Sequence, residues 1–172
     1  MSEANQRLML TGMGAVRRNH ALEHATLHIL GRKFKNQSIG GYSDMSGFWI
    51  IGEIPTEDIQ EAVEEGLQRL RNGEAQLAVH PNCGTNYVVS GMVIGSLAWL
   101  GMVNSGGSIR KKLDRLPLIV SLVTVGLILV QPLGPLLQQK VTTDPNPGGL
   151  SVYEITRFMR RGINMHRIKT HM

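Results

Sequence analysis

Two long apolar runs in the second half of the chain constrain its fold more than any other feature. VVSGMVIGSLAWLGMV covers residues 88–103 without a charged residue, and LPLIVSLVTVGLILVQPLGPLL covers residues 116–137. A helix of about 20 residues crosses the ~30 Å hydrocarbon core of a bilayer. The alternative is a buried core hairpin, but 172 residues leave too little other sequence to cover two apolar helices on every side. We therefore predict a transmembrane helical hairpin, with helices at about 88–104 and 116–137.

The composition divides the chain into three predicted parts. Residues 1–87 form a small soluble domain, residues 88–139 contain the hairpin, and residues 140–172 are a linker, TTDPNPGG, and a basic C-terminal segment. Because residues 1–20 lack a long apolar stretch, we expect no cleavable signal peptide, so that the hairpin itself directs insertion. Small residues in SGMVIGSLAWLG allow close helix packing, through self-association or with a partner helix.

The sequence does not decide on which side of the membrane the soluble domain lies. A cytoplasmic loop is favoured by its basic residues, Arg110, Lys111, Lys112 and Arg115. That orientation would carry about 85 residues across the membrane without a leader. In such a case loop charges determine the orientation less reliably. Cys83 is the only cysteine, which excludes an intrachain disulfide and does not indicate a compartment.

The net charge of +5 comes mostly from the loop and the C-terminal tail. Aromatic residues are only 5% of the chain and no recognition motif accompanies the charge, so we predict no nucleic-acid partner. A second interpretation of the tail is contact with anionic lipid through Arg157, Arg160, Arg161, Arg167 and Lys169.

The soluble part has the pattern of an α+β domain with the order α-β-β-α-β and helices on one face of the sheet. A helix is predicted over about 16–32, followed by strands at SIGGYSD and GFWIIGEI. PTEDIQEAVEEGLQRLRNG is amphipathic, with Thr56 as its predicted cap and Asn72-Gly73 as its end. AQLAVHP is the predicted third strand, and a terminal β-hairpin is predicted around Arg161-Gly162.

The first helix carries the pattern HALEH, in which His20 and His24 lie four residues apart. Both imidazoles therefore fall on one helix face, and Glu23 stays beside them. This is the H-x-x-E-H order of inverted zinc peptidases, in which two histidines bind zinc and the glutamate acts as acid or base. The alternative is a solvated helix face that happens to carry histidines.

A catalytic zinc needs a third protein ligand and an open position. Cys83, in the turn HPNCGTN, is the predicted third ligand, and the alternative for a lone cysteine is a small buried hydrophobe. His80 and a glutamate of the second helix, Glu64 or Glu65, compete for the role. His28 lies one turn further along the first helix as a supporting or merely packed residue.

Three separated motifs resemble S-ribosylhomocysteine lyase, the autoinducer-2 synthase: HALEH, SDMSGFWIIGEIPTEDIQEAVEEGLQRL and LAVHPNCGTNY. The resemblance covers roughly residues 19–87 and implies a fold shared with inverzincin peptidases. It implies His20, His24 and Cys83 as metal ligands and Glu23 as acid/base. RNHALEHAT also resembles the signature of an uncharacterised family of small bacterial membrane proteins, which implies the bacterial inner membrane.

The lyase carries a second catalytic cysteine where this chain has Asp44, Met45 and Ser46, so we expect a different reaction. Asp44 in a Gly/Ser-rich turn is expected to make local hydrogen bonds rather than to reach the metal. The sequence thus predicts a membrane-bound zinc hydrolase that acts on a peptide or amide near the membrane. The alternatives are a non-enzymatic anchoring protein with structural zinc held by His20, His24, His80 and Cys83, and a metal-free adaptor at the membrane surface.

Overall fold

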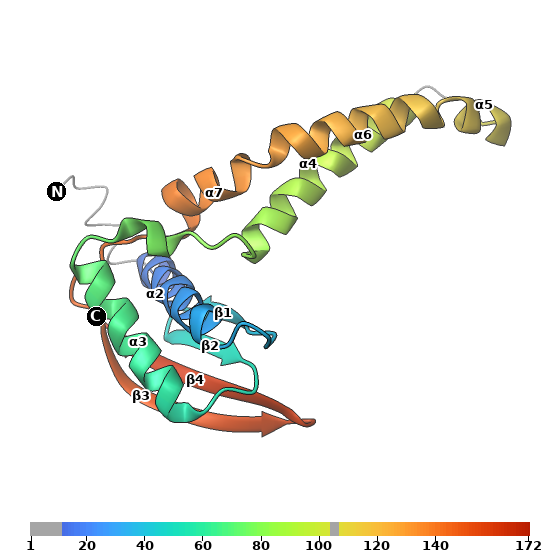
Figure 1. The fold of residues 1–172 in the computed structure, drawn as a ribbon. Helices are drawn as coiled ribbons and strands as arrows, with labels where there is room; N and C mark the ends of the chain where they lie inside the picture. The colour runs from blue at the N-terminus through green and yellow to red at the C-terminus, as the bar shows by residue number, and fades with distance from the viewer. Residues whose placement is uncertain (1–11, 104–106) are drawn as a thin grey trace. The chain divides into compact units, whose positions relative to one another are not determined.

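The structure is a computed structural model that describes residues 12–103 and 107–172 (Figure 1). It divides into two compact units, one made of residues up to His80 together with Gln138–Met172, and the other of Pro81–Leu137. The first eleven residues of the predicted soluble domain, and residue 104 at the predicted end of the first apolar helix, lie outside the described residues.

The first unit is an α+β domain, as predicted. Among its described residues, four strands form one antiparallel sheet in the order β1-β2-β4-β3. Along the chain its elements are α2 (Gly12–Lys33), β1 (Gly40–Asp44), β2 (Gly47–Ile51), α3 (Thr56–Arg71), the 3₁₀-helix η1 (Ala75–Ala78), the π-helical turn η2 (Gln138–Thr142), β3 (Ser151–Arg160) and β4 (Ile163–His171).

Helices α2 and α3 lie over the same face of the sheet (Figure 1). The core between these layers is apolar: Leu22 and Leu30 of α2 are fully buried, and so are Phe48 and Ile168 of the sheet. The predicted stripe of α3 is buried as well, from Ile59 to Leu70. Burial of such side chains contributes roughly 1.5–3 kcal/mol each, which makes this layer the main source of stability.

The limits of the two helices differ slightly from the prediction. Helix α2 passes Gly31 and ends at Lys33. Pro55, not Thr56, precedes the first turn of α3, so the predicted cap is wrong; the Thr56 hydroxyl lies 3.1 Å from Nε2 of His166 instead. Helix α3 ends at Arg71, before Asn72 and a Gly73 with φ of +89°, as predicted.

The predicted third strand, AQLAVHP, is wrong. Residues Ala75–Ala78 form a 3₁₀-helix, and Leu77 and Ala78 are both buried, which an alternating strand would not allow. The place beside β2 is taken by β4, which pairs with the whole of β2 from Gly47 to Ile51. The segment packs against α2 instead.

The predicted terminal β-hairpin is confirmed by β3 and β4. Its two-residue turn is formed by Arg161 and Gly162, whose φ angles are +53° and +78°. The hairpin does not stand apart as a basic tail, because β4 occupies the middle of the sheet between β2 and β3.

The second unit is helical: α4 (Gly84–Met102), α5 (Ile109–Asp114), α6 (Leu116–Val130) and α7 (Leu133–Leu137). Helices α4 and α6 run side by side (Figure 1), with Gly126 against Leu97 and Gly101 against Ile119. The Arg115 guanidinium donates to the carbonyl oxygen of Val103 at 2.8 Å, at the end of α4. The predicted second helix is interrupted at Gln131-Pro132, since proline lacks the N–H that a continuous helix requires.

Within the described residues, one helical stretch, Ile109–Val130, is long and apolar enough to cross a membrane by length and composition. Helix α4 begins at Gly84, four residues earlier than the predicted 88. Its first turn therefore contains Thr85 and Asn86, polar residues that lower its mean hydropathy.

We expect Gly47→Ala to lower the free energy of unfolding by about 2–4 kcal/mol. Gly47 has a φ of +141°, and a Cβ there would collide with the main-chain carbonyl of Ile168. Gly40→Ala is the control, because a Cβ at Gly40 meets nothing within 4 Å. Denaturant titration of the two variants measures the difference, and equal unfolding free energies would contradict the pairing of Gly47 with Lys169 in the sheet.

Candidate metal centre

Three histidines of α2 donate to main-chain carbonyl oxygens. Nδ1 of His24 lies 2.7 Å from the oxygen of Ala78, and Nε2 of His28 lies 2.8 Å from that of Val79. Nδ1 of His20 lies 3.0 Å from the oxygen of Thr142. Because a carbonyl oxygen can only accept, each of these ring nitrogens carries the hydrogen.

These hydrogen bonds decide which nitrogen of each histidine can bind a metal. With Nδ1 protonated, a neutral His20 or His24 presents the lone pair of Nε2. Zinc-binding histidines commonly donate their other N–H to a carbonyl or carboxylate, which fixes both the tautomer and the orientation of the ring. His24 is buried and its ring centroid lies 4.3 Å from that of His20. The pair is therefore held in the state that a metal requires.

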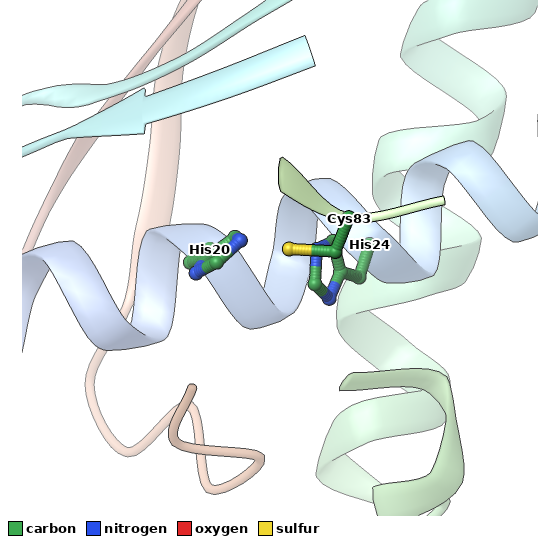
Figure 2. A group of neighbouring side chains, drawn as sticks. All are labelled: His20, His24 and Cys83. Carbon is green, nitrogen blue, oxygen red and sulfur yellow. The ribbon is translucent and has the colours of Figure 1, made fainter. Parts of the chain in front are cut away.

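Cys83 joins these two histidines. One potential ligand atom from each of His20, His24 and Cys83 lies within 4.8 Å of the others (Figure 2). Cys83 follows His80 by three residues and occupies the N-cap position of α4. The thiolate is the form of cysteine that binds metal. Two nitrogens and one sulfur match a three-ligand zinc site.

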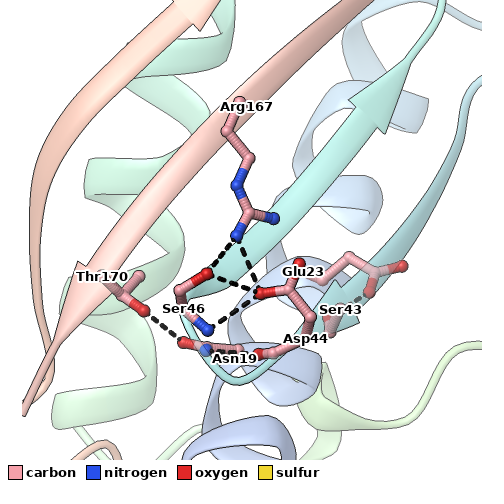
Figure 3. A network of polar contacts seen from close by, with 7 residues as sticks. All are labelled: Asn19, Glu23, Ser43, Asp44, Ser46, Arg167 and Thr170. Carbon is pink, nitrogen blue, oxygen red and sulfur yellow. Dashed lines mark hydrogen bonds and ion pairs between the residues drawn. The ribbon is translucent and has the colours of Figure 1, made fainter.

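Glu23 lies in the interior with only 3% of its surface exposed. Burial raises the pKa of its carboxyl, while the hydrogen bond from Ser43 and the charge of His20 lower it in part. The Ser43 hydroxyl donates to Oε2 (Figure 3). Oε1 lies beside Gly41, where an added Cβ would be 2.7 Å away. A glycine and a serine at alternate positions of β1 thus make room for the carboxyl group and hold one of its oxygens.

His80 and His28 extend the histidine cluster. The His80 ring centroid lies 5.7 Å from that of His24 and 4.7 Å from that of His28. Burial, together with the nearby His28 and His24, lowers the pKa of His80 to about 4. His80 is therefore neutral at pH 7, yet within the described part of the chain the group of potential metal ligands contains Cys83 rather than His80.

The other acidic candidates point elsewhere. Glu64 accepts a hydrogen bond from Gln60, and Glu65 pairs with Arg69, both on exposed parts of α3. Asp44 accepts from Arg167 at 2.7 Å and from the main-chain N–H of Ser46 at 2.8 Å (Figure 3). The bond from Ser46 is the local hydrogen bond expected of Asp44 in its turn, whereas the bond from Arg167 comes from β4 and was not expected.

Asn19, the residue before His20, fixes α2 against the sheet. Its side-chain amide donates to the carbonyl oxygen of Asp44 at 2.9 Å and accepts from the Thr170 hydroxyl at 2.7 Å (Figure 3). Asn19 is fully buried, so both bonds are needed to offset its loss of hydration. The helix is thereby held in the rotation that points Glu23 at Ser43.

Sequence patterns did not indicate the residues that support the site: Asn19, Ser43, Thr142 and Gln138. Gln138 is fully buried and hydrogen-bonds both main-chain groups of His80. The only signal for Gln138 in the sequence is weak: two glutamines directly follow an apolar run. A side chain that hydrogen-bonds to main-chain groups leaves no spacing pattern in the sequence.

A family model described as a domain of unknown function, DUF6391, matches residues 15–155. The chain belongs to the DUF6391 family. The matched region includes HALEH, Cys83 and the helices α4, α5, α6 and α7.

An uncharacterized protein of Picosynechococcus sp. (strain ATCC 27264 / PCC 7002 / PR-6) is similar to this DUF6391 chain at 35% identity. The similarity covers 49% of this chain and 48% of the relative, so the chain spans about half the length of the curated relative it matches. No solved structure matches the chain.

We expect Asp44→Asn to leave the metal content unchanged and to lower the free energy of unfolding by about 1 kcal/mol at pH 7, since the carboxylate is partly solvated. Burial raises the pKa of Asp44, but hydrogen bonds from Arg167 and Ser46 outweigh it, and the pKa lies below its usual value. A lowered pKa stabilises the fold above the unfolded value of about 4, and this stabilisation is lost as the pH falls through the lower folded value.

Denaturant titrations of Asp44→Asn and wild type between about pH 3 and 7 measure this difference, and elemental analysis measures the metal. A loss of metal in the variant would place Asp44 in the site and contradict its assignment to the turn.

Proposed function

We propose that this protein is a membrane-bound zinc hydrolase of the peptidase or amidase type, with His20, His24 and Cys83 as ligands and Glu23 as general base. The observation that carries the proposal is the hydrogen bonding of the two histidines, each of which donates Nδ1–H to a carbonyl oxygen. A solvated helix face, the alternative for HALEH, would not bury His24 and Glu23 or supply matched acceptors.

The residues around the ligands suit hydrolysis. A zinc ion bound here would polarise a substrate carbonyl and activate water. Because Ser43 donates to Oε2 of Glu23, Oε1 is the atom that would take up a proton and later return it to the leaving amine. The Ser43 bond keeps the carboxyl from rotating, and the absence of a side chain at Gly41 makes room for Oε1 itself.

The membrane part of the proposal is a two-helix hairpin made of α4 and the stretch Ile109–Val130. Its support is the hydropathy of that stretch and the close contacts of Gly101 and Gly126 with the facing helix. Cys83 directly precedes α4, so a hydrolase built on this cysteine would act on amide bonds near the bilayer surface.

A structural zinc site is the second candidate. The observation that favours it is the proximity of His80, neutral at pH 7, to His24. A fourth protein ligand would close the site, since structural zinc leaves no position for water. The two functions differ in their need for Glu23.

Elemental analysis of the detergent-purified protein tests the site first. We expect about one zinc per chain in wild type, full retention in Glu23→Gln, loss in the double variant His20→Ala, His24→Ala, and weaker retention in Cys83→Ala. Glu64→Gln, an exposed acidic position on α3, is the control and should retain its zinc. A folded wild type without metal would overturn the proposal.

Hydrolysis is tested with a mixture of synthetic peptides in detergent micelles, followed by mass spectrometry. We expect cleavage by wild type and a loss of about 10²–10⁴-fold in rate in Glu23→Gln at equal zinc content. Zinc in both proteins with no cleavage in either would favour the structural site.

A further inference from the structure

We infer that Gln138 is a positioning residue for the metal centre: its side-chain amide holds together the two chain segments that orient His20 and His24. This inference rests on the proposed zinc site and adds a residue to it that lies more than a hundred positions from His20 and His24 in the sequence.

The contact between Gln138 and His80 is two-sided. Oε1 of Gln138 accepts from the main-chain N–H of His80 at 2.8 Å, and Nε2 donates to the carbonyl oxygen of His80 at 3.1 Å. A primary amide places an N–H donor of its NH₂ group beside its oxygen acceptor, so it can pair with both main-chain groups of one residue as a neighbouring strand would. Gln138 is fully buried. Loss of its amide would therefore leave the main-chain N–H and carbonyl oxygen of His80 without these hydrogen bonds in the interior, which costs free energy.

The first segment held in this way orients His24. Ala78 and Val79, directly before His80, supply the carbonyl oxygens that accept from His24 and His28. A shift of this short segment would therefore move the acceptor that sets the His24 ring. Cys83 follows three residues later in the same stretch.

The second segment orients His20. The carbonyl oxygen of Gln138 accepts from the main-chain N–H of Thr143 at 2.9 Å and from its hydroxyl at 2.8 Å. These bonds close the turn that presents the carbonyl oxygen of Thr142 to Nδ1 of His20. Gln138 thus connects the acceptor of one metal-binding histidine with the acceptor of the other, and both ring orientations depend on it.

The test uses the full-length protein in detergent, with Co²⁺ as the metal. We expect Gln138→Met, a substitution of similar size without the amide, to weaken Co²⁺ binding about 10–100-fold and to change the visible absorption of the bound ion. Chelator competition measures the affinity, and the absorption spectrum reports the ligand geometry. Gln139→Met, at the exposed neighbouring position, is the matched control and should behave as wild type.

A second control separates positioning from general stability. Ile168→Val removes one methyl group from the fully buried core and should lower the melting temperature without changing the Co²⁺ spectrum. If Gln138→Met does not fold, Gln138→Asn decides: it keeps a buried amide but is one methylene too short to bond both main-chain groups of His80, and weaker Co²⁺ binding in this variant supports the inference.

The different failures are distinguishable. A wild type that binds no metal overturns the zinc site itself, and the role of Gln138 with it. A wild type that binds Co²⁺ together with a folded Gln138→Met that matches it in affinity and spectrum overturns only the role of Gln138. If Gln138→Met does not fold, unchanged Co²⁺ binding in a folded Gln138→Asn likewise overturns only the role of Gln138.

Discussion

The burial of polar side chains on helix α2 is the constraint on which the rest of the first unit depends. Asn19, Glu23 and His24 are almost fully enclosed, and each would be costly without a partner. The partners come from β1, β4 and η1. The sheet therefore does more than cover an apolar face, because it supplies the hydrogen bonds that allow a helix with this sequence to be interior.

The elements with strong local signals could be predicted from the sequence. The amphipathic period of α3, the small and β-branched residues of β1 and β2 and the Arg161-Gly162 turn all indicated the right type of structure. The segment AQLAVHP could not be assigned correctly, because its alternation fits a strand while the place beside β2 belongs to β4. Strand order depends on a pairing across more than a hundred residues, which local pattern does not contain.

In the candidate site, too, some residues could be predicted from the sequence and others could not. His20, Glu23 and His24 follow from helix geometry, and Cys83 from the need for a third ligand; the structure brings the two histidines and the cysteine together. The supporting groups are mostly main-chain carbonyls, those of Ala78 and Thr142, and every residue has a carbonyl. No residue type in the sequence could mark them, so the orientation of the histidines is visible only in three dimensions.

The strand order also bears on how the protein is made. Strand β4 lies between β2 and β3 in the sheet, but along the chain it follows the helices of the second unit. While those helices leave the ribosome, β2 has an open edge and half of the sheet does not yet exist. The N-terminal residues at that stage are therefore an unfinished domain, because Asn19 of α2 still lacks the hydrogen bond from Thr170 of β4. The sheet is completed only after the second unit has been synthesised.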